Sequence, residues 1–455
     1  MSKIFDIFIT QILGQAPFLM GIIVFIGYLA LRRGLSTAIS GFIKASVGFM
    51  ILQVGTGGLT STFAPILDAL RKSYGIEGAV MDSYVALSSA NNALGNNVAY
   101  VGYALLIGFA WNILLVALSK YTKIRTLQVT GHVMFVQTSI LLWMVFHTLG
   151  QVDWINVLVA GILIGTYWSV FSNLTLDITN EVTNDANFAI GHQQMLGLWL
   201  SSKLAPKLSG KKDKSIEELK FPGWLQMFND NIVATTVLMT LFFGAIIVAI
   251  GPDHFETNLI FPLFIYSTTA KFAVYLSVIL YGVRMFVAEL VESFQGISNR
   301  ILPGSAPAVD IATIYGFGHP NATLLGFVSG ALGQVLGLIL LFITKSPVFL
   351  IPGFIPMFFD NAGIAVYANH YGGVRAAMIL PFLTGIIHVV LGSFTYILSG
   401  MSGGVMANFD WVTLIPGYML VMKYGGLIGI ILVIIAMLCI PHIQDRRRKK
   451  SVKNI

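Results

Sequence analysis

Four ionisable side chains lie in strongly apolar stretches of this chain: His132, His192, Asp310 and Asp360. Ionisable groups in such surroundings are costly and by default mark a functional site. Asp310 could serve as a base that removes a proton from a substrate hydroxyl. It could equally be the N-cap of a helix, because the residues SAPAVD lead into IATIY.

Amide side chains accompany these groups. His192 is followed by Gln193 and Gln194, which together offer several hydrogen-bond donors and acceptors suited to sugar hydroxyls. We expect this cluster within an apolar helix, where it could instead hydrogen-bond a neighbouring helix. His132 is open to both a site role and a packing role. Asp360 and Asn361 follow a break rich in proline and glycine and could be a cap.

The sequence gives no sign of a cofactor or of a metal site. The single cysteine, Cys439, lies in the last apolar run, and Cys and His residues show no metal-ligand spacing. No glycine-rich phosphate-binding loop ending in Lys-Ser or Lys-Thr occurs, so we expect no bound nucleotide.

The composition determines which elements must position these residues. Of 455 residues, 56% are hydrophobic and 10% are charged, with a mean hydropathy of +0.80. A soluble domain carries about 25% charged residues, so a water-soluble fold is excluded. Apolar runs near the roughly 20 residues that cross a bilayer recur throughout. They predict one polytopic all-α membrane unit, residues 1–455, with about eleven transmembrane helices. We expect no cleavable signal peptide, because residues 1–15 lack a basic region followed by an apolar run and a cleavage site of small residues.

Lysine and arginine cluster at four places, and these predict the topology. They lie at Arg32 and Arg33, near Lys120, in the loop 201–222 and in the tail 441–455. The positive-inside rule assigns such segments to the cytoplasm, so we expect an external N-terminus, a cytoplasmic C-terminus and a multi-pass protein of the inner (cytoplasmic) membrane. We expect the short basic tail to contact anionic lipid rather than nucleic acid.

Two halves of the chain show a faint repeat. Residues 1–200 and 223–440 flank the polar cytoplasmic loop 201–222, and similar sequence contexts surround three glycine pairs at nearly constant offset: Gly102 with Gly326, Gly131 with Gly353 and Gly191 with Gly417. An odd number of crossings per half makes such a repeat inverted, with a solute site between the halves.

Two polar segments interrupt the apolar pattern at equivalent positions of the halves, residues 83–97 and 302–320. Their backbone cannot face hydrocarbon unless it is buried in protein or lines a cavity. They predict a pair of re-entrant hairpins around the site.

Several motifs carry a resemblance to a known family. TGHVMFVQ at 130–137, EVTNDANFAIGHQQ at 181–194 and IPGFIPMFFDNAGIAVYANHYGGVRAA at 351–377 closely resemble the ascorbate-specific permease of the bacterial phosphotransferase system, its IIC component. GFMILQVGTGGLTSTF at 48–63 and RMFVAEL at 284–290 match as well. The resemblance runs nearly end to end.

This resemblance implies a homodimer in which each protomer pairs a substrate-carrying core domain with a dimerising scaffold domain. It implies an elevator-type motion of the core, and phosphorylation of the sugar by a separate IIB protein charged by a IIA protein. The permease then supplies the acceptor side of the phosphoryl transfer, while the phosphocysteine donor is on the partner.

Carried over motif by motif, the resemblance implies that substrate is held by Ser83, Tyr84, His132, His192, Gln193 and Asp310, with Asp310 as candidate base. Val136 and Gln137, which follow His132 in the same motif, are included in the predicted substrate-binding set. The family pattern after the first histidine has glutamine where this chain has Val136. Val136 shares a helix face with His132, whereas Gln137 is turned away. Residues 88–97 also lack the charges of the pattern. These departures predict a retuned ascorbate site, or another sugar acid or polyol.

Two other function classes remain open from the residues alone. An ion-coupled secondary transporter of a small anionic metabolite could use Asp310 or Asp360 to bind Na⁺ or a proton. A membrane sensor or scaffold without transport would have no need of the buried polar cluster.

Overall fold

The computed structural model describes residues 15–210, 216–219, 222–302 and 305–453. The segment 1–14, on which the predicted external N-terminus depends, lies outside this part of the chain. The first half contains α2 (Ala16–Ala30), α3 (Leu35–Tyr74), β1 (Glu77–Met81), α4 (Ser83–Leu94), α5 (Ala99–Ala117), α6 (Ser119–Thr122), β2 (Thr126–Gln128), α7 (Gly131–Leu149), α8 (Trp154–Thr183), β3 (Ala189–Ile190) and α9 (Met195–Leu208).

The second half follows a short connection that includes two short 3-10 helices, η3 (Ile216–Glu218) and η4 (Gly223–Asn229). It contains α10 (Asn231–Ile250), α11 (Phe261–Ile301), β4 (Ala306–Val309), η6 (Ile311–Gly316), α12 (Pro320–Ile343), β5 (Val348–Pro352), η7 (Pro356–Asp360), α13 (Asn361–Ser399), β6 (Gly404–Val405), α14 (Phe409–Thr413) and α15 (Ile415–Lys453).

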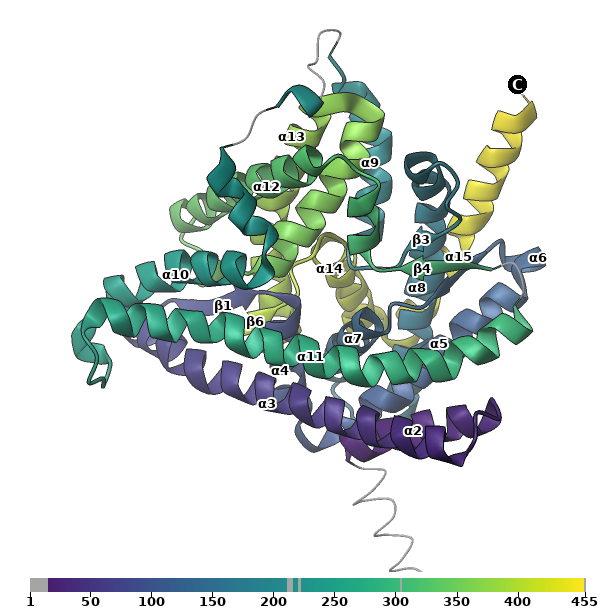
Figure 1. The fold of residues 1–455 in the computed structure, drawn as a ribbon, viewed down its shortest axis with the longest axis horizontal. Helices are drawn as coiled ribbons and strands as arrows, with labels where there is room; N and C mark the ends of the chain where they lie inside the picture. The colour runs from purple at the N-terminus through teal and green to yellow at the C-terminus, as the bar shows by residue number, and fades with distance from the viewer. Residues whose placement is uncertain (1–14, 211–215, 220–221, 303–304, 454–455) are drawn as a thin grey trace, which may run out of the picture.

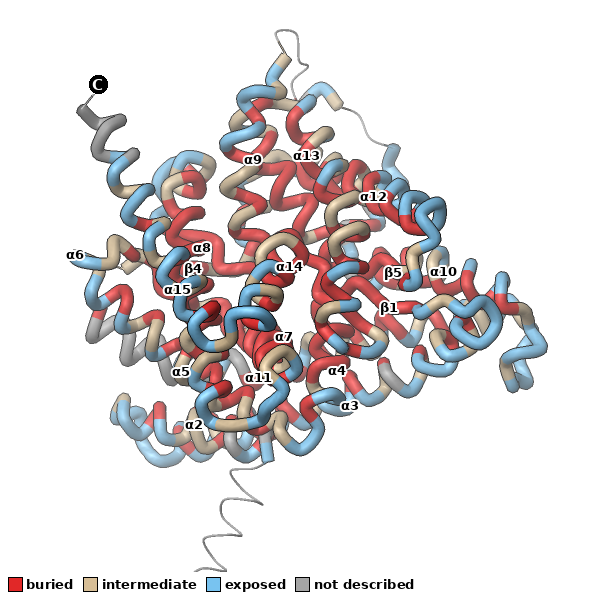
Figure 2. Tube along the Cα trace, turned by 180° about the vertical axis from the view of Figure 1, so that it is seen from behind, coloured by how far each residue is buried: buried red, intermediate tan, exposed pale blue. Residues whose placement is uncertain are grey.

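Nine helices of the described chain are long and apolar enough to cross a membrane. Two of the longest bend at a glycine with positive φ, α13 at Gly373 and α15 at Gly426, so a count of continuous helices is not a count of crossings. Large apolar side chains face outward, such as Ile428 at 72% exposure and Val54 at 67%. Figure 2 shows these exposed stretches along α2, α3 and α15. The fold is that of a helical membrane protein, and the number eleven stays a prediction.

Helices α2, α3 and α11 run side by side along one edge of the molecule (Figure 1). Glycines let α3 and α11 approach to backbone contact, since a Cβ added at Gly48 would lie 2.7 Å from the backbone nitrogen of Phe286. Likewise, a Cβ at Gly282 would lie 2.5 Å from the nitrogen of Leu52. Close approach at small residues is how membrane helices associate tightly, so α3 and α11 form a closely packed pair within this layer.

Two further helix pairs, one in each half of the chain, pack in a similar way. Helix α5 packs on α8, where a Cβ at Gly165 would lie 2.4 Å from the carbonyl oxygen of Gly108. Helix α12 packs on α13, where a Cβ at Gly385 would lie 2.2 Å from the carbonyl oxygen of Gly330. Each half therefore contributes one helix pair joined through glycine.

Six short strands form two parallel sheets, which the all-α prediction did not include. One sheet has the order β5-β1-β6, and the other has the order β2-β4-β3. The first strand of each half thus lies between the second and third strands of the other half. This exchange is the arrangement that an internal repeat would produce, and the repeat itself stays a prediction.

The segments predicted to re-enter the membrane are short. Residues 83–97 form α4 and one further turn, and the described part of 302–320 forms β4 and η6. The 12 residues of α4 rise about 18 Å, short of the roughly 30 Å of hydrocarbon. Their backbone lies in protein, because nine of the α4 residues are buried.

Candidate functional site

A cavity of about 310 Å³ lies where the two short segments meet α7, the end of β3 and helix α11. Its wall combines seven residues predicted to bind substrate with an arginine and several aromatic side chains: Ser83, Tyr84, His132, Val136, His192, Gln193, Asp310, Arg284, Tyr315, Phe354, Phe358 and Phe359. Small-molecule sites usually occupy clefts of about 300 Å³ or more with a few convergent polar groups. This cavity has both properties.

A strand followed by an aspartate positions each short segment. Asp82 directly follows β1, and its carboxylate accepts hydrogen bonds from the backbone nitrogens of Tyr84 (2.9 Å) and Ile355 (3.3 Å). Asp310 directly follows β4 in the same way and accepts from the backbone nitrogen of Ala312 at 2.8 Å. Both carboxylates therefore cap the turn that follows them, which fixes where Ser83 and Tyr84 enter the cavity.

Asp310 is also paired with His132. Strand β2 lies beside β4 in parallel register, so the carboxyl ends of both strands reach the same edge, and His132 begins α7 just beyond it. The Nε2 atom of His132 lies 2.8 Å from Oδ2 of Asp310, and both side chains are about a quarter exposed. Asp310 thus serves as cap through Oδ1 and faces the cavity through Oδ2, so the two alternatives weighed for this residue are compatible.

The cluster His192, Gln193 and Gln194 is not helical, which corrects the expectation that it lies within a helix. The three residues form the irregular link between β3, which pairs with β4, and the start of α9. His192 Nδ1 lies 2.6 Å from Gln194 Oε1, and the Gln194 amide donates to the carbonyl of Phe359 at 3.2 Å. Gln194 therefore orients the histidine, while His192 and Gln193 line the cavity.

Val136 and Gln137 lie on different sides of α7. Val136 lines the cavity, whereas Gln137 is fully buried away from it. The Gln137 amide donates to the carbonyl of His192 at 3.1 Å and accepts from the indole of Trp168 at 2.6 Å. Gln137 was predicted to bind substrate, and the structure instead places it behind the wall as a support for His192.

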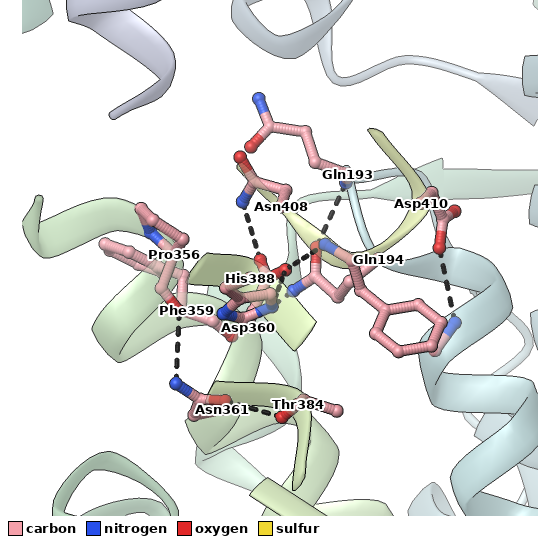
Figure 3. A network of polar contacts seen from close by, with 12 residues as sticks. Gln193, Gln194, Pro356, Phe359, Asp360, Asn361, Thr384, His388, Asn408 and Asp410 are labelled. Atoms are coloured by element: carbon pink, nitrogen blue, oxygen red, sulfur yellow. Dashed lines mark hydrogen bonds and ion pairs between the residues drawn. The ribbon is translucent and has the colours of Figure 1, made fainter. Parts of the chain in front are cut away.

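Asp360 belongs to a network under the cavity floor (Figure 3). Its two oxygens accept from the amide of Asn408 (2.7 Å) and from the backbone nitrogen of Phe409 (2.8 Å). The ring of His388 lies 3.4 Å away, and both side chains of this pair are fully buried. Asn408 in turn accepts from the Ser83 hydroxyl at 2.8 Å. Asp360 therefore caps α14 and is linked to the site through Asn408.

Asn361 is also buried and lies outside the cavity wall. Its amide donates to the carbonyl of Met357 at 2.9 Å, and its oxygen accepts from the hydroxyl of Thr384 at 2.7 Å. It holds the start of α13 against a later turn of the same long helix.

Ser83 joins the two halves of the chain. Its hydroxyl lies 3.0 Å from Gln193 Oε1, on the segment after β3, and 2.8 Å from Asn408 Oδ1, on the segment after β6. The cavity is therefore built from both halves of the chain.

Arg284 is a wall residue that the sequence analysis did not single out. It lies on α11 on the same face as Leu276 and Leu280, and all three line the cavity. Its nearby acidic partner in sequence, Glu289, is engaged elsewhere, with Lys44 and the hydroxyl of Tyr28, each at 2.8 Å. A lone arginine at the inner face of an otherwise apolar stripe is the signal that could have identified it.

A second cavity, of about 430 Å³, is larger than the first. It lies on the other side of α4, and its charged residues are Asp68, Arg71 and Glu77. Two of these pair locally, since Arg71 contacts Asp68 at 3.3 Å, and Glu77 accepts from the hydroxyl of Tyr396 at 2.6 Å. No histidine lines it, so we assign the site to the smaller cavity, where histidines and a carboxylate converge.

Two comparisons with known proteins point to the same family. A family model described as "PTS system sugar-specific permease component" matches residues 11–412. The chain is similar to the "Ascorbate-specific PTS system EIIC component" of Mycoplasma pneumoniae, with 36% identity over 436 residues. The alignment covers 85% of this chain and 66% of that protein, so the chain spans just under two thirds of its relative's length. The chain belongs to the family of sugar-specific permease components of the phosphotransferase system.

Proposed function

We propose that this chain is a IIC permease that translocates L-ascorbate or a related sugar acid while a separate IIB protein phosphorylates it. The observation that carries this proposal is the pairing of Asp310 with His132 in a cavity that also presents His192, Gln193 and Arg284. Amides and histidines can bind hydroxyl groups, and a guanidinium can bind the oxygens of an acid. The name of the similar Mycoplasma protein favours ascorbate.

Phosphoryl transfer requires a base, and Asp310 is the candidate. One oxygen of Asp310 is occupied by the backbone of Ala312, and the other faces His132 and the cavity. In the proposed step the substrate hydroxyl oxygen attacks the phosphorus of the partner's phosphocysteine, and the thiolate leaves. The hydroxyl proton passes to Asp310, with His132 holding the carboxylate in place. Cys439, the single cysteine of this sequence, lies on α15 and does not line the cavity, so we assign the phosphocysteine donor to the partner.

The arrangement of helices supports the rest of the proposal. The cavity lies between α11 and the short segments, so motion of the segments past α11 would carry the substrate between the two sides. Helices α2, α3 and α11 are then the scaffold, and an exposed apolar face of this layer would form the homodimer contact. We propose an external N-terminus and a cytoplasmic C-terminus from the basic clusters.

The geometry favours phosphorylation over ion coupling. Both oxygens of Asp360 already accept hydrogen bonds, and the side chain is fully buried. Asp360 also lies outside the cavity wall, so it is not placed to bind an ion together with the substrate. Hydroxyl-binding groups surround Asp310 instead.

Transport in vesicles distinguishes these mechanisms. Vesicles that contain the chain are supplied with phosphoenolpyruvate, the general phosphotransferase proteins and the IIA and IIB proteins, and an ionophore collapses the ion gradients. We expect labelled ascorbate to accumulate as its phosphate ester. Uptake that stops with the gradients, or that yields free ascorbate, would refute the proposal.

A further inference from the structure

A basic pocket of about 280 Å³ lies at the far end of α5, where α6 and the C-terminal part of α15 meet the side of α8. Figure 2 shows α6 and α15 as neighbours at this edge of the molecule. Its charged lining consists of four cations and two carboxylates: Lys120, Lys123, Arg125, Arg448, Asp177 and Asp445. The pocket therefore carries a positive excess that the transport site does not explain.

The floor of the pocket is internally neutral. The guanidinium of Arg125 donates to Asp177 at 2.8 Å, and the amide of Gln444 donates to the other oxygen of Asp177 at 3.2 Å. Asp177 is thus fully engaged within the protein, and it does not neutralise the cations at the rim.

The two lysines are held together by a tight turn. Lys123 ends α6 with a positive φ of 63°, and its ammonium donates to the carbonyl of Lys120 at 2.6 Å. Within the described residues, neither ammonium has a carboxylate within 4 Å. The turn therefore presents two ammonium groups whose charge is available to an anion.

The pocket adjoins an exposed apolar surface at the end of a candidate membrane span. Helix α5 is a candidate span that ends at Ala117, immediately before the residues that line the pocket. Leu114 and Leu118, one helical turn apart, are 45% and 43% exposed, and Tyr121 beside them is 70% exposed. Apolar residues that run into an aromatic and then a basic pocket match the order of acyl chain, interface and headgroup across a bilayer.

We infer that this pocket binds the phosphate headgroup of an anionic phospholipid, with the acyl chains along α5. Ammonium and guanidinium groups bind phosphate oxygens through charge-assisted hydrogen bonds, and basic pockets between membrane helices hold anionic headgroups. This inference does not depend on which solute the permease carries.

Native mass spectrometry of the full-length protein in neutral detergent can test it, with phosphatidylglycerol, phosphatidylcholine and soluble glycerol 3-phosphate as probes. The pocket variant is Lys120→Gln with Lys123→Gln. The matched control is Lys203→Gln with Lys207→Gln, which removes two exposed charges from α9. Each lysine near an anionic surface contributes roughly a fivefold factor in affinity. The Kd of phosphatidylglycerol should therefore rise about 25-fold in the pocket variant and stay about the same in the control.

Several results would overturn the inference. Equal losses in both variants would indicate general surface attraction. Equal binding of phosphatidylcholine would show that the negative charge is not recognised. Equal affinity for glycerol 3-phosphate would make the ligand a soluble phosphate ester, and slower phosphorylation by IIB with unchanged lipid binding would make this surface a protein contact. If the double variant fails to fold, Arg448→Gln, on the exposed end of α15, should weaken binding of phosphatidylglycerol about fivefold.

Discussion

Replacing Asp310 with asparagine separates its chemical role from its structural one. Asparagine keeps an oxygen for the backbone nitrogen of Ala312, which Asp310 contacts at 2.8 Å, and its amide can still contact His132. What is lost is a carboxylate that can accept a proton. Loss of a general base slows a reaction about 10² to 10⁴-fold.

The expected changes in stability and binding are much smaller. The side chains of His132 and Asp310 are 26% and 28% exposed, and an ion pair this accessible stabilises a fold by at most about 1 kcal/mol. One altered hydrogen bond to the substrate costs roughly 1 kcal/mol, or about fivefold in affinity. The predicted result is therefore a turnover that falls far more than the affinity does.

Two measurements on one preparation test this prediction. The first is the rate of ascorbate phosphorylation with saturating IIB, and the second is equilibrium binding of labelled ascorbate without phosphoenolpyruvate. Asp68→Asn is the matched control, because Asp68 is an exposed carboxylate beside the larger cavity. Equal losses of turnover and affinity in Asp310→Asn would show that Asp310 binds substrate and is not the base.

Three further changes have defined outcomes. Arg284→Gln should weaken binding of a sugar acid about tenfold but leave a neutral polyol nearly unaffected, as measured by competition binding; equal weakening of both would remove the charge role. Val136→Gln should raise ascorbate affinity about fivefold if its amide reaches a hydroxyl, and an unchanged Kd in the same assay would exclude that contact. Gly385→Ala should lower the free energy of unfolding by about 1–3 kcal/mol, and so lower the melting temperature, because the new methyl group would meet the carbonyl oxygen of Gly330 at 2.2 Å. Gly417→Ala, with open space around its Cβ position, should be neutral or stabilising, and similar melting of both variants would contradict the packing argument.

The membrane class, and several polar residues that line the smaller cavity, could be identified from the sequence. Ionisable groups in apolar surroundings are few, so His132, His192 and Asp310 could be identified one by one. Helical spacing also separated Val136 from Gln137. The structure then brings His132 and Asp310 into contact although they are far apart in the chain.

The strands could not be predicted in the same way. Strands β3 and β6 have two residues each, and their partners are distant in sequence, so neither has a local alternating pattern. Missing β3 also led to the wrong assignment of the His192 segment to a helix. An apolar flank predicts burial, but it does not distinguish a short buried strand from a helix.

Arg284 and the floor network depended on tertiary contacts. Arg284 belongs to an amphipathic stretch whose charged face is expected to be solvated. Only the packing of α11 shows that Arg284 borders the cavity. Asp360 was recognised as a possible cap. That it caps α14, through Phe409, follows from a contact between residues that are far apart in sequence.

A structure with ascorbate bound tests the central claim most directly, which is that both halves of the chain build one sugar site. We predict density for ascorbate in the smaller cavity, within hydrogen-bond distance of Asp310, His132 and Gln193. Density in the larger cavity beside Arg71, under conditions where the same preparation phosphorylates ascorbate, would contradict it.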